Sequence, residues 1–239
     1  MHRRGDHVYS APTRETKLSP AIEDYVKAIY LLHQEHAQVT TSLLAKQLGV
    51  APASVSGMIH RLAKLTLVTH IPYRGVVLTD VGQRTALAVL RRHRLLELFL
   101  VEALEYSWDE VHEEAEVLEH VISETLEARI AERLGHPIID PHGDPIPFPD
   151  LTLPPDAYES LVKLPLGAQG HIVRVIDQES AHLRYLQKLG LVPGATVTVH
   201  ARAPFDGPLT LAVGDTVHVI DSRMACSILV RAPEEEGAG

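Results

Sequence analysis

The segment from His112 to His120 limits the possible folds and functions of this chain more than any other. On an α-helix of 3.6 residues per turn, side chains spaced by 4, 7 and 8 positions project to the same side. Two imidazoles and two carboxylates share this spacing: His112, Glu116, Glu119 and His120. His93 and Glu97 repeat the i, i+4 spacing in an apolar-periodic stretch that also predicts a helix. The two patterns together predict two helices that face each other across metal.

The alternative is that the glutamates of this segment only form the solvated face of an acidic helix, because charge runs usually face solvent. His112 and His120 would then bind no metal. The segment from His112 to His120 does not match the known motifs of catalytic metal sites. A zinc-protease helix needs a histidine four residues after His112, where this chain has Glu116. A di-iron bundle needs a glutamate three residues before His120, where it has Val117. The pattern therefore favours a metal site without a known catalytic motif.

Length and composition set outer limits. A chain of 239 residues is long enough for two or three small domains. It contains no run of 18 apolar residues, so we expect no membrane span and no membrane partner. The first seven residues lead into no apolar core of a secretory signal, so a cytoplasmic location is expected. Cys226 is the single cysteine, which excludes an intrachain disulfide, and we expect it to be a buried small hydrophobe.

Charge is divided unevenly along the chain. Residues 1–94 carry 13 Lys and Arg against 6 Asp and Glu, residues 95–150 carry 2 against 15, and residues 151–239 carry 7 against 10. The nets are +7, −13 and −3 on a chain whose total is −9. A basic third on an acidic protein suggests local contact with a polyanion. The acidic middle coincides with the proposed metal ligands.

The basic third has the order of a winged helix-turn-helix. Pro52 suits a first helical turn, and two β-branched runs joined by a turn from Pro72 to Gly75 predict a two-stranded wing. The expected elements are helices over 19–36, 41–48 and 52–65 and strands over 67–71 and 76–79. The third of these helices would enter the major groove of double-stranded DNA. The alternative is a winged helix that contacts proteins.

This helix offers few side chains that could hydrogen-bond to base edges, because its first turns carry small side chains and Gly57 carries none. Specificity is therefore expected to depend partly on DNA shape. Arg61 and Lys64 are expected to hold phosphates, and Arg74 at the wing tip a phosphate or the minor groove. The expected DNA-contacting residues are Pro52, Ala53, Ser54, Ser56, Arg61, Lys64 and Arg74.

A proline-rich linker over 136–149 marks a domain boundary, because it can neither continue a helix nor pair as a central strand. Short β-rich runs separated by glycine turns follow, and they predict a small barrel. The expected strands cover 170–176, 196–200, 209–213, 216–220 and 225–230. The expected domains are 1–87 for DNA binding, 88–150 for helices, metal and the linker, and 151–239 for the barrel.

The middle region has more apolar positions than two isolated amphipathic helices need. They are Leu95, Leu96, Leu98, Phe99, Leu100, Val117, Leu118, Val121, Ile122 and Leu126. A homodimer interface would use the excess. Two-fold symmetry would then place two recognition helices ~34 Å apart on a palindromic operator.

The winged helix-turn-helix, the Arg-His-Arg-Leu-Leu-Glu segment at 92–97 and the segment at 111–120 together resemble the diphtheria-toxin-repressor family of metal-dependent transcriptional regulators. The resemblance covers nearly the whole chain. It implies a mainly α protein with small β parts: a winged helix-turn-helix, a helical dimerisation and metal-binding domain, and a C-terminal SH3-like barrel of the FeoA type.

The resemblance also implies a primary metal site made of Asp24, Glu116, Glu119 and His120. Manganese-responsive members carry acids where this chain has Asp24 and Glu116, so the resemblance implies Mn(II). Oxygen ligands with one imidazole also suit this hard cation. Fe(II) remains the second candidate. An ion held by these residues would clamp the DNA-binding domain to the dimer domain.

Some manganese-type members of the family have an acid where this chain has Lys27, and that acid helps to complete a close two-metal cluster. A charged lysine cannot bind a metal ion in its place. We therefore expect a separate second site formed by His93, Glu97 and His112. The resemblance implies further ligands from the C-terminal domain, near Asp177, Gln178 and Glu179. In isolation these three residues indicate only a polar turn after a strand.

The main hypothesis is a manganese-activated, dimeric, non-enzymatic repressor of manganese and iron uptake genes. An Fe(II)-responsive regulator of the same family is the alternative. A metal-dependent hydrolase that uses Glu116 or Glu119 as base is disfavoured, since a full set of protein ligands leaves little open coordination. A metal-independent winged-helix adaptor is the third hypothesis, and chelation would leave its DNA affinity unchanged.

Overall fold

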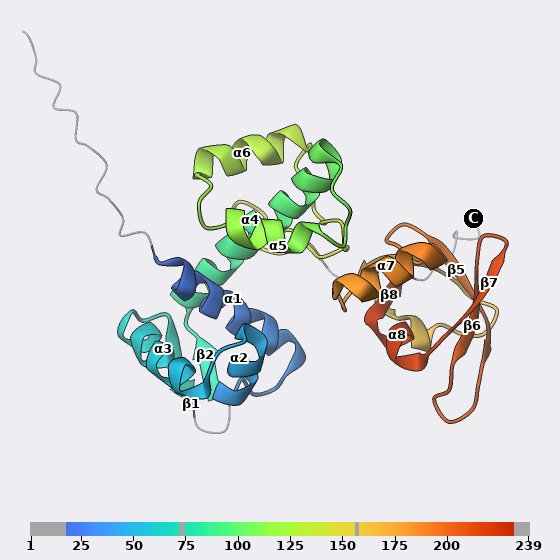
Figure 1. Ribbon diagram of the computed structural model, residues 1–239, viewed down its shortest axis with the longest axis horizontal. Coiled ribbons are helices and arrows are strands. Elements are labelled where there is room, and N and C mark those ends of the chain that lie inside the picture. The colour runs from blue at the N-terminus through green and yellow to red at the C-terminus, as the bar shows by residue number, and fades with distance from the viewer. Residues whose placement is uncertain (1–17, 72–74, 156–157, 232–239) are drawn as a thin grey trace, which may run out of the picture. The chain divides into compact units, whose positions relative to one another are not determined.

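The computed structural model describes residues 18–71, 75–155 and 158–231, and the chain divides into two compact units, Met1–Gln83 and Arg84–Gly239. Figure 1 shows the helices and the two sheets. The first unit holds α1 (Pro20–Glu35), α2 (Thr41–Leu48), α3 (Pro52–Lys64), β1 (Val68–Ile71) and β2 (Gly75–Leu78). These elements match the predicted winged helix-turn-helix.

Local chemistry explains where these helices begin and end. Proline occupies the first turn of both α1 and α3, where a missing N–H breaks no helical bond. The Thr40 hydroxyl accepts a hydrogen bond from the Leu43 N–H at 3.2 Å and caps α2. Gly49, with a φ of 65°, ends α2 in the left-handed conformation that glycine tolerates. The tip of the wing, including Arg74, lies outside the described residues.

The second unit begins with a helical part: α4 (Asp80–Leu104, which starts just before the division), α5 (Val111–Leu118) and α6 (Glu124–Arg133). Its core contains Leu95, Leu96, Ala115, Ile130, Ala131 and Ile146. The prediction of one helix through His120 was wrong at its end. The N–H groups of Val121 and Ile122 both donate to the Leu118 carbonyl, which tightens the last turn, so Glu119 and His120 follow α5 in a turn.

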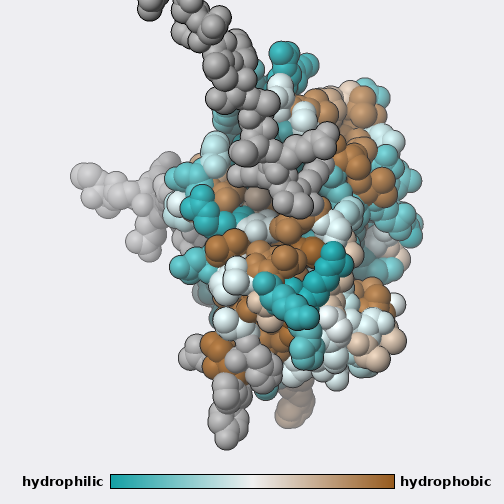
Figure 2. All heavy atoms as spheres, turned by 90° about the vertical axis from the view of Figure 1, so that its left-hand side faces the viewer, coloured by the Kyte–Doolittle hydropathy of each residue, from teal (hydrophilic) through white to brown (hydrophobic). Residues whose placement is uncertain are grey.

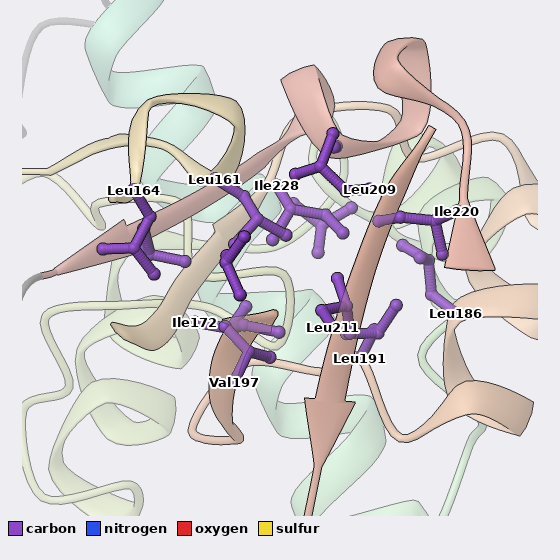
Figure 3. Packing of buried hydrophobic residues seen from close by; sticks show 14 of the residues in the cluster. Leu161, Leu164, Ile172, Leu186, Leu191, Val197, Leu209, Leu211, Ile220 and Ile228 are labelled. Carbon is purple, nitrogen blue, oxygen red and sulfur yellow. The ribbon is translucent and has the colours of Figure 1, made fainter. Parts of the chain in front are cut away.

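The C-terminal part of this unit is a six-stranded antiparallel sheet of order β3-β8-β4-β5-β6-β7. Its strands are β3 (Glu159–Ser160), β4 (Gln169–Val175), β5 (Thr196–Arg202), β6 (Leu209–Val213), β7 (Thr216–Ile220) and β8 (Ile228–Arg231). The short 3-10 helix η1 (Leu161–Lys163) and the helices α7 (Ser180–Leu189) and α8 (Ser222–Ser227) complete it. Figure 3 shows its core, where leucines, isoleucines and valines from strands and helices meet.

The prediction of a mainly α protein with a small C-terminal β-barrel is confirmed, with local corrections. The last expected strand begins only at Ile228, because the Asp221 carboxylate accepts from the Met224 N–H at 2.8 Å and caps α8 instead. Cys226 lies in that helix and is exposed, so its expected burial was wrong. Helix α7 was not predicted.

The proline-rich segment contains no helix, but part of it is an ordered turn over 140–144. The Asp140 carboxylate accepts from the N–H groups of His142 and Asp144 at 2.8 and 2.9 Å. The Val175 N–H donates to the His142 carbonyl at 2.9 Å. A Cβ on Gly143, whose φ is +86°, would lie 1.8 Å from the Val173 carbonyl oxygen. The turn is therefore seated against the backbone of β4.

Trp108 and Asp109 also join the helical part of the second unit to the SH3-like part. Trp108 belongs to the core of the sheet and donates from its indole to Gln187 at 3.2 Å. The Asp109 carboxylate pairs with Arg184 at 3.0 Å, and its carbonyl accepts from Ser180 at 2.8 Å. The barrel is thus docked by a buried aromatic side chain as well as by polar contacts.

The face shown in Figure 2 mixes hydrophilic and hydrophobic residues. Within the described part of the chain, no helix combines the length and the apolar character that crossing a bilayer requires.

We expect Gly143→Ala to destabilise the second unit more than Gly194→Ala. Both glycines have a positive φ, so each substitution incurs a strain of about 1–2 kcal/mol. Only the Gly143 variant also drives a methyl group into a backbone oxygen, whereas nothing lies within 4 Å of a Cβ at Gly194. Urea unfolding followed by the fluorescence of the single tryptophan measures the difference. Equal losses in the two variants would contradict the close seating of the turn.

Candidate metal centre

His93 and Glu97 on α4 and His112 on α5 form a compact group, as their spacing suggested. The Glu97 carboxylate lies 3.0 Å from His93 Nε2 and 3.2 Å from His112 Nδ1. The two rings meet edge to face, with centroids 4.9 Å apart. His93 and Glu97 are buried, and His112 is exposed. One carboxylate oxygen and two ring nitrogens thus converge at one point.

The other nitrogen of His93 reaches a second group. Its Nδ1 lies 2.6 Å from an oxygen of Glu119, which is fully buried at the end of α5. His120 Nε2 lies 3.5 Å from the other oxygen of Glu119. Glu116, His93 and Glu119 each offer one ligand atom, and these three atoms lie within 4.8 Å of one another. His93 therefore contacts residues of both predicted metal sites.

Asp24, the remaining residue of the predicted primary site, lies on α1 in the first unit. Glu116, Glu119 and His120 belong to the second unit. The predicted primary set thus draws on both units of the chain. Lys27 follows Asp24 by one helical turn on α1.

Asp140 and His142 were missed from the sequence, and they face the same Glu97. His142 Nδ1 lies 3.7 Å from the second oxygen of Glu97, and its Nε2 donates to the Trp108 carbonyl at 2.7 Å. Asp140 Oδ2 and His142 Nδ1 are both buried without a hydrogen-bond partner. A buried polar atom without a partner costs free energy. A cation bound by Glu97, Asp140 and His142 would satisfy both atoms, so these residues fit a metal ion.

Proton affinities in this group support the same conclusion. Burial alone would raise the pKa of Glu97, but the surrounding His93, His112 and His142 hold it well below its usual range. Burial opposes the charged form of His142, yet the Glu97 carboxylate raises its pKa to about 9. Burial, followed by repulsion from Asp144 and Glu97, raises the pKa of Asp140 well above its usual range. The cluster therefore attracts positive charge, either as protons or as a metal.

Asp177, Gln178 and Glu179, the candidate ligands from the C-terminal domain, have different surroundings in the structure. Gln178 donates to an oxygen of Asp144 at 2.5 Å. Asp177 lies 3.2 Å from His182, and Glu179 is exposed. Among the described residues, neither Asp177 nor Glu179 belongs to a group that could hold a metal ion with Glu97.

Helix α3 presents the residues expected to contact DNA. Val55 and Leu62 are buried and anchor the helix, whereas six predicted contact residues are exposed: Pro52, Ala53, Ser54, Ser56, Arg61 and Lys64. The Ser56 hydroxyl donates to the Pro52 carbonyl at 3.2 Å, within the helix itself.

Comparison with known protein families assigns each part of the chain. Residues 17–76 match the iron dependent repressor N-terminal DNA binding domain, and residues 79–148 match the iron dependent repressor metal binding and dimerisation domain. Residues 159–232 match the FeoA domain.

Individual proteins resemble the chain over most of its length. The iron-dependent repressor IdeR of Mycobacterium leprae is 32% identical over 222 residues, which are 87% of this chain and 95% of that protein. The diphtheria toxin repressor of Corynebacterium glutamicum is 33% identical over 70% of this chain and 76% of its own length. A solved structure of a manganese-dependent transcriptional repressor in complex with manganese has a TM-score of 0.81 and 41% identity, and covers 88% of this chain and 99% of its own. The chain belongs to the iron-dependent repressor family of metal-dependent transcriptional regulators, which includes the diphtheria toxin repressor.

Proposed function

We propose that this protein is a homodimeric repressor of manganese and iron uptake genes and that Mn(II) activates it. The chemistry of the ligand set carries this proposal. The set of Asp24, Glu116, Glu119 and His120 offers oxygen atoms and one imidazole, which suit a hard cation better than sulfur-binding metals. The manganese-bound neighbour supports the same metal, whereas the iron-dependent relatives keep Fe(II) as the alternative.

The division of the proposed ligands between the two units supports a clamp mechanism of activation. Asp24 belongs to the DNA-binding unit, and the other three ligands belong to the unit with the dimerisation domain. An ion held by all four would join the two units and fix the spacing of the recognition helices. Without the ion, the carboxylates repel one another. Because linkage is reciprocal, operator DNA should tighten metal binding by the factor by which metal tightens DNA binding.

Exposed apolar residues in and after α5 support the proposed dimer surface. Of the ten apolar positions predicted in excess, Leu95, Leu96 and Leu100 are at most 3% exposed, so they are already buried within the chain. Val117, Val121 and Leu126 remain 67%, 66% and 45% exposed. A second copy of the chain would cover these three and bring two recognition helices to a palindromic operator.

Glu116→Ala should abolish Mn(II)-dependent retardation of promoter DNA and leave the dimer intact, because it removes one primary ligand without touching the apolar surface. Glu113→Ala is the matched control: it removes a carboxylate of the same helix that belongs to none of the described ligand groups. Retardation is measured while Mn(II), Fe(II) under anoxia and Zn(II) are titrated at fixed salt. If apo-protein and metal-loaded protein bind DNA equally, the chain is instead a metal-independent DNA-binding protein.

Arg61→Ala and Lys64→Ala should weaken binding to all DNA sequences alike. Each side chain is expected to neutralise one phosphate, so each substitution should lower the slope of log affinity against log salt by about 1. Lys188→Ala, on α7 of the second unit, is the control and should leave the slope unchanged. Fluorescence anisotropy over a range of salt concentrations gives the slopes. Unchanged slopes for the α3 variants would remove α3 from the DNA interface.

The free energy of unfolding of the apo-protein should fall as the pH rises from about 6.5 to about 9. The folded state holds the His142 proton up to a pKa of about 9, above the ordinary value of 6.5. The stabilisation is therefore complete below the ordinary pKa and is lost as the pH rises through the folded pKa. Urea unfolding at several pH values measures the slope. His142→Gln should flatten it, and an equally steep slope in that variant would assign the effect to other groups.

A further inference from the structure

A buried carboxylate, Asp144, receives donors from three elements of the second unit. Arg94 on α4 donates to its Oδ1 at 3.4 Å, and Arg174 on β4 forms an ion pair with the same oxygen. Gln178, after β4, donates to Oδ2 at 2.5 Å. Asp144 is only 6% exposed. A carboxylate so buried and so fully bonded has a fixed orientation.

The backbone of Asp144 determines how Asp140 is oriented. The Asp144 N–H donates to Asp140 Oδ1 at 2.9 Å, and the His142 N–H donates to the same oxygen at 2.8 Å. Oδ1 is thereby occupied, and Oδ2, which makes no hydrogen bond and lies 3.9 Å from Arg94 Nε, is the oxygen that remains in the group with Glu97. A shift of residue 144 would therefore change the orientation of the Asp140 carboxylate relative to Glu97.

Two of the three donors to Asp144 come from the FeoA domain, which spans 159–232. The same domain supplies the seat of the turn, through the contact of Gly143 with Val173 and the hydrogen bond from Val175 to His142. Neither Arg174 nor Gln178 needs to touch an ion to affect it. Partners behind metal ligands of this kind typically change metal affinity about 10- to 100-fold.

We propose that Arg174 and Gln178 are positioning residues by which the FeoA domain sets the affinity of the Glu97, Asp140 and His142 group for a divalent cation. They act by holding Asp144 and do not ligate the cation. The proposal rests on the cation binding put forward above. It makes cation binding and the seating of the 140–144 turn against β4 reciprocally coupled.

Gln178→Glu separates this role from direct ligation. If residue 178 were a ligand, a carboxylate there would tighten Mn(II) binding, because an anionic oxygen suits this cation better than an amide. In the structure it faces the Asp144 carboxylate, so a glutamate would remove the donor and set two like charges against each other. The two roles therefore predict opposite changes in affinity.

The experiment measures Mn(II) binding to the full-length apo-protein by titration calorimetry and by electron paramagnetic resonance of free Mn(II). Glu116→Ala is the common background, so that the primary site does not obscure binding at the Glu97, Asp140 and His142 group. Gln178→Glu should weaken the remaining site by about 10- to 100-fold, and Gln178→Met, which changes no charge, should weaken it less. The matched control is Arg184→Met, which breaks the ion pair with Asp109 and leaves the 140–144 turn untouched. It should keep the affinity of the background protein.

Hydrogen exchange provides a readout of docking that does not depend on affinity. Mn(II) should slow exchange of the Val175 and Asp144 N–H groups, and Gln178→Glu should remove this protection while Arg184→Met keeps it.

If Gln178→Glu tightens Mn(II) binding or leaves it unchanged, the positioning role is wrong. Equal weakening in Arg184→Met would assign the effect to docking as a whole and overturn the specific role of Asp144. If neither the background protein nor the wild type binds Mn(II), the proposed function itself fails.

Discussion

The burial of Glu97 among three imidazoles is the interaction on which the rest of the second unit depends. An isolated carboxylate at 1% exposure would be expelled or protonated. His93, His112 and His142 keep its pKa low, and these histidines in turn come from α4, α5 and the 140–144 turn. A single charge therefore draws two helices and a loop to one point. The adjacent SH3-like domain docks onto the loop that this arrangement holds in place.

Residues that repeat along one helix could be predicted from the sequence. The i, i+4 spacing of His93 and Glu97 and the spacing from His112 onward identified the two helices that carry the candidate ligands, because helical geometry places such residues side by side. The winged helix-turn-helix was equally predictable from its apolar period and from Pro52. In each case the signal lies within single helices and strands, where local geometry determines proximity.

Contacts between distant segments could not be predicted in this way. Asp140 and His142 meet Glu97 across more than forty residues, and their Asp-Pro-His-Gly-Asp setting resembles an ordinary proline-rich linker. Gln178 was placed near the metal from the family resemblance, but the structure joins it to Asp144. The early end of α5 after Leu118 also depends on how the following turn bonds. Proximity of this kind comes from tertiary folding.

His93 contacts Glu119 through one ring nitrogen and Glu97 through the other. The two candidate metal-binding groups are therefore not structurally separable. Any substitution at position 93 alters the surroundings of both carboxylates together. A change in the position of this ring therefore moves a contact in each group at the same time.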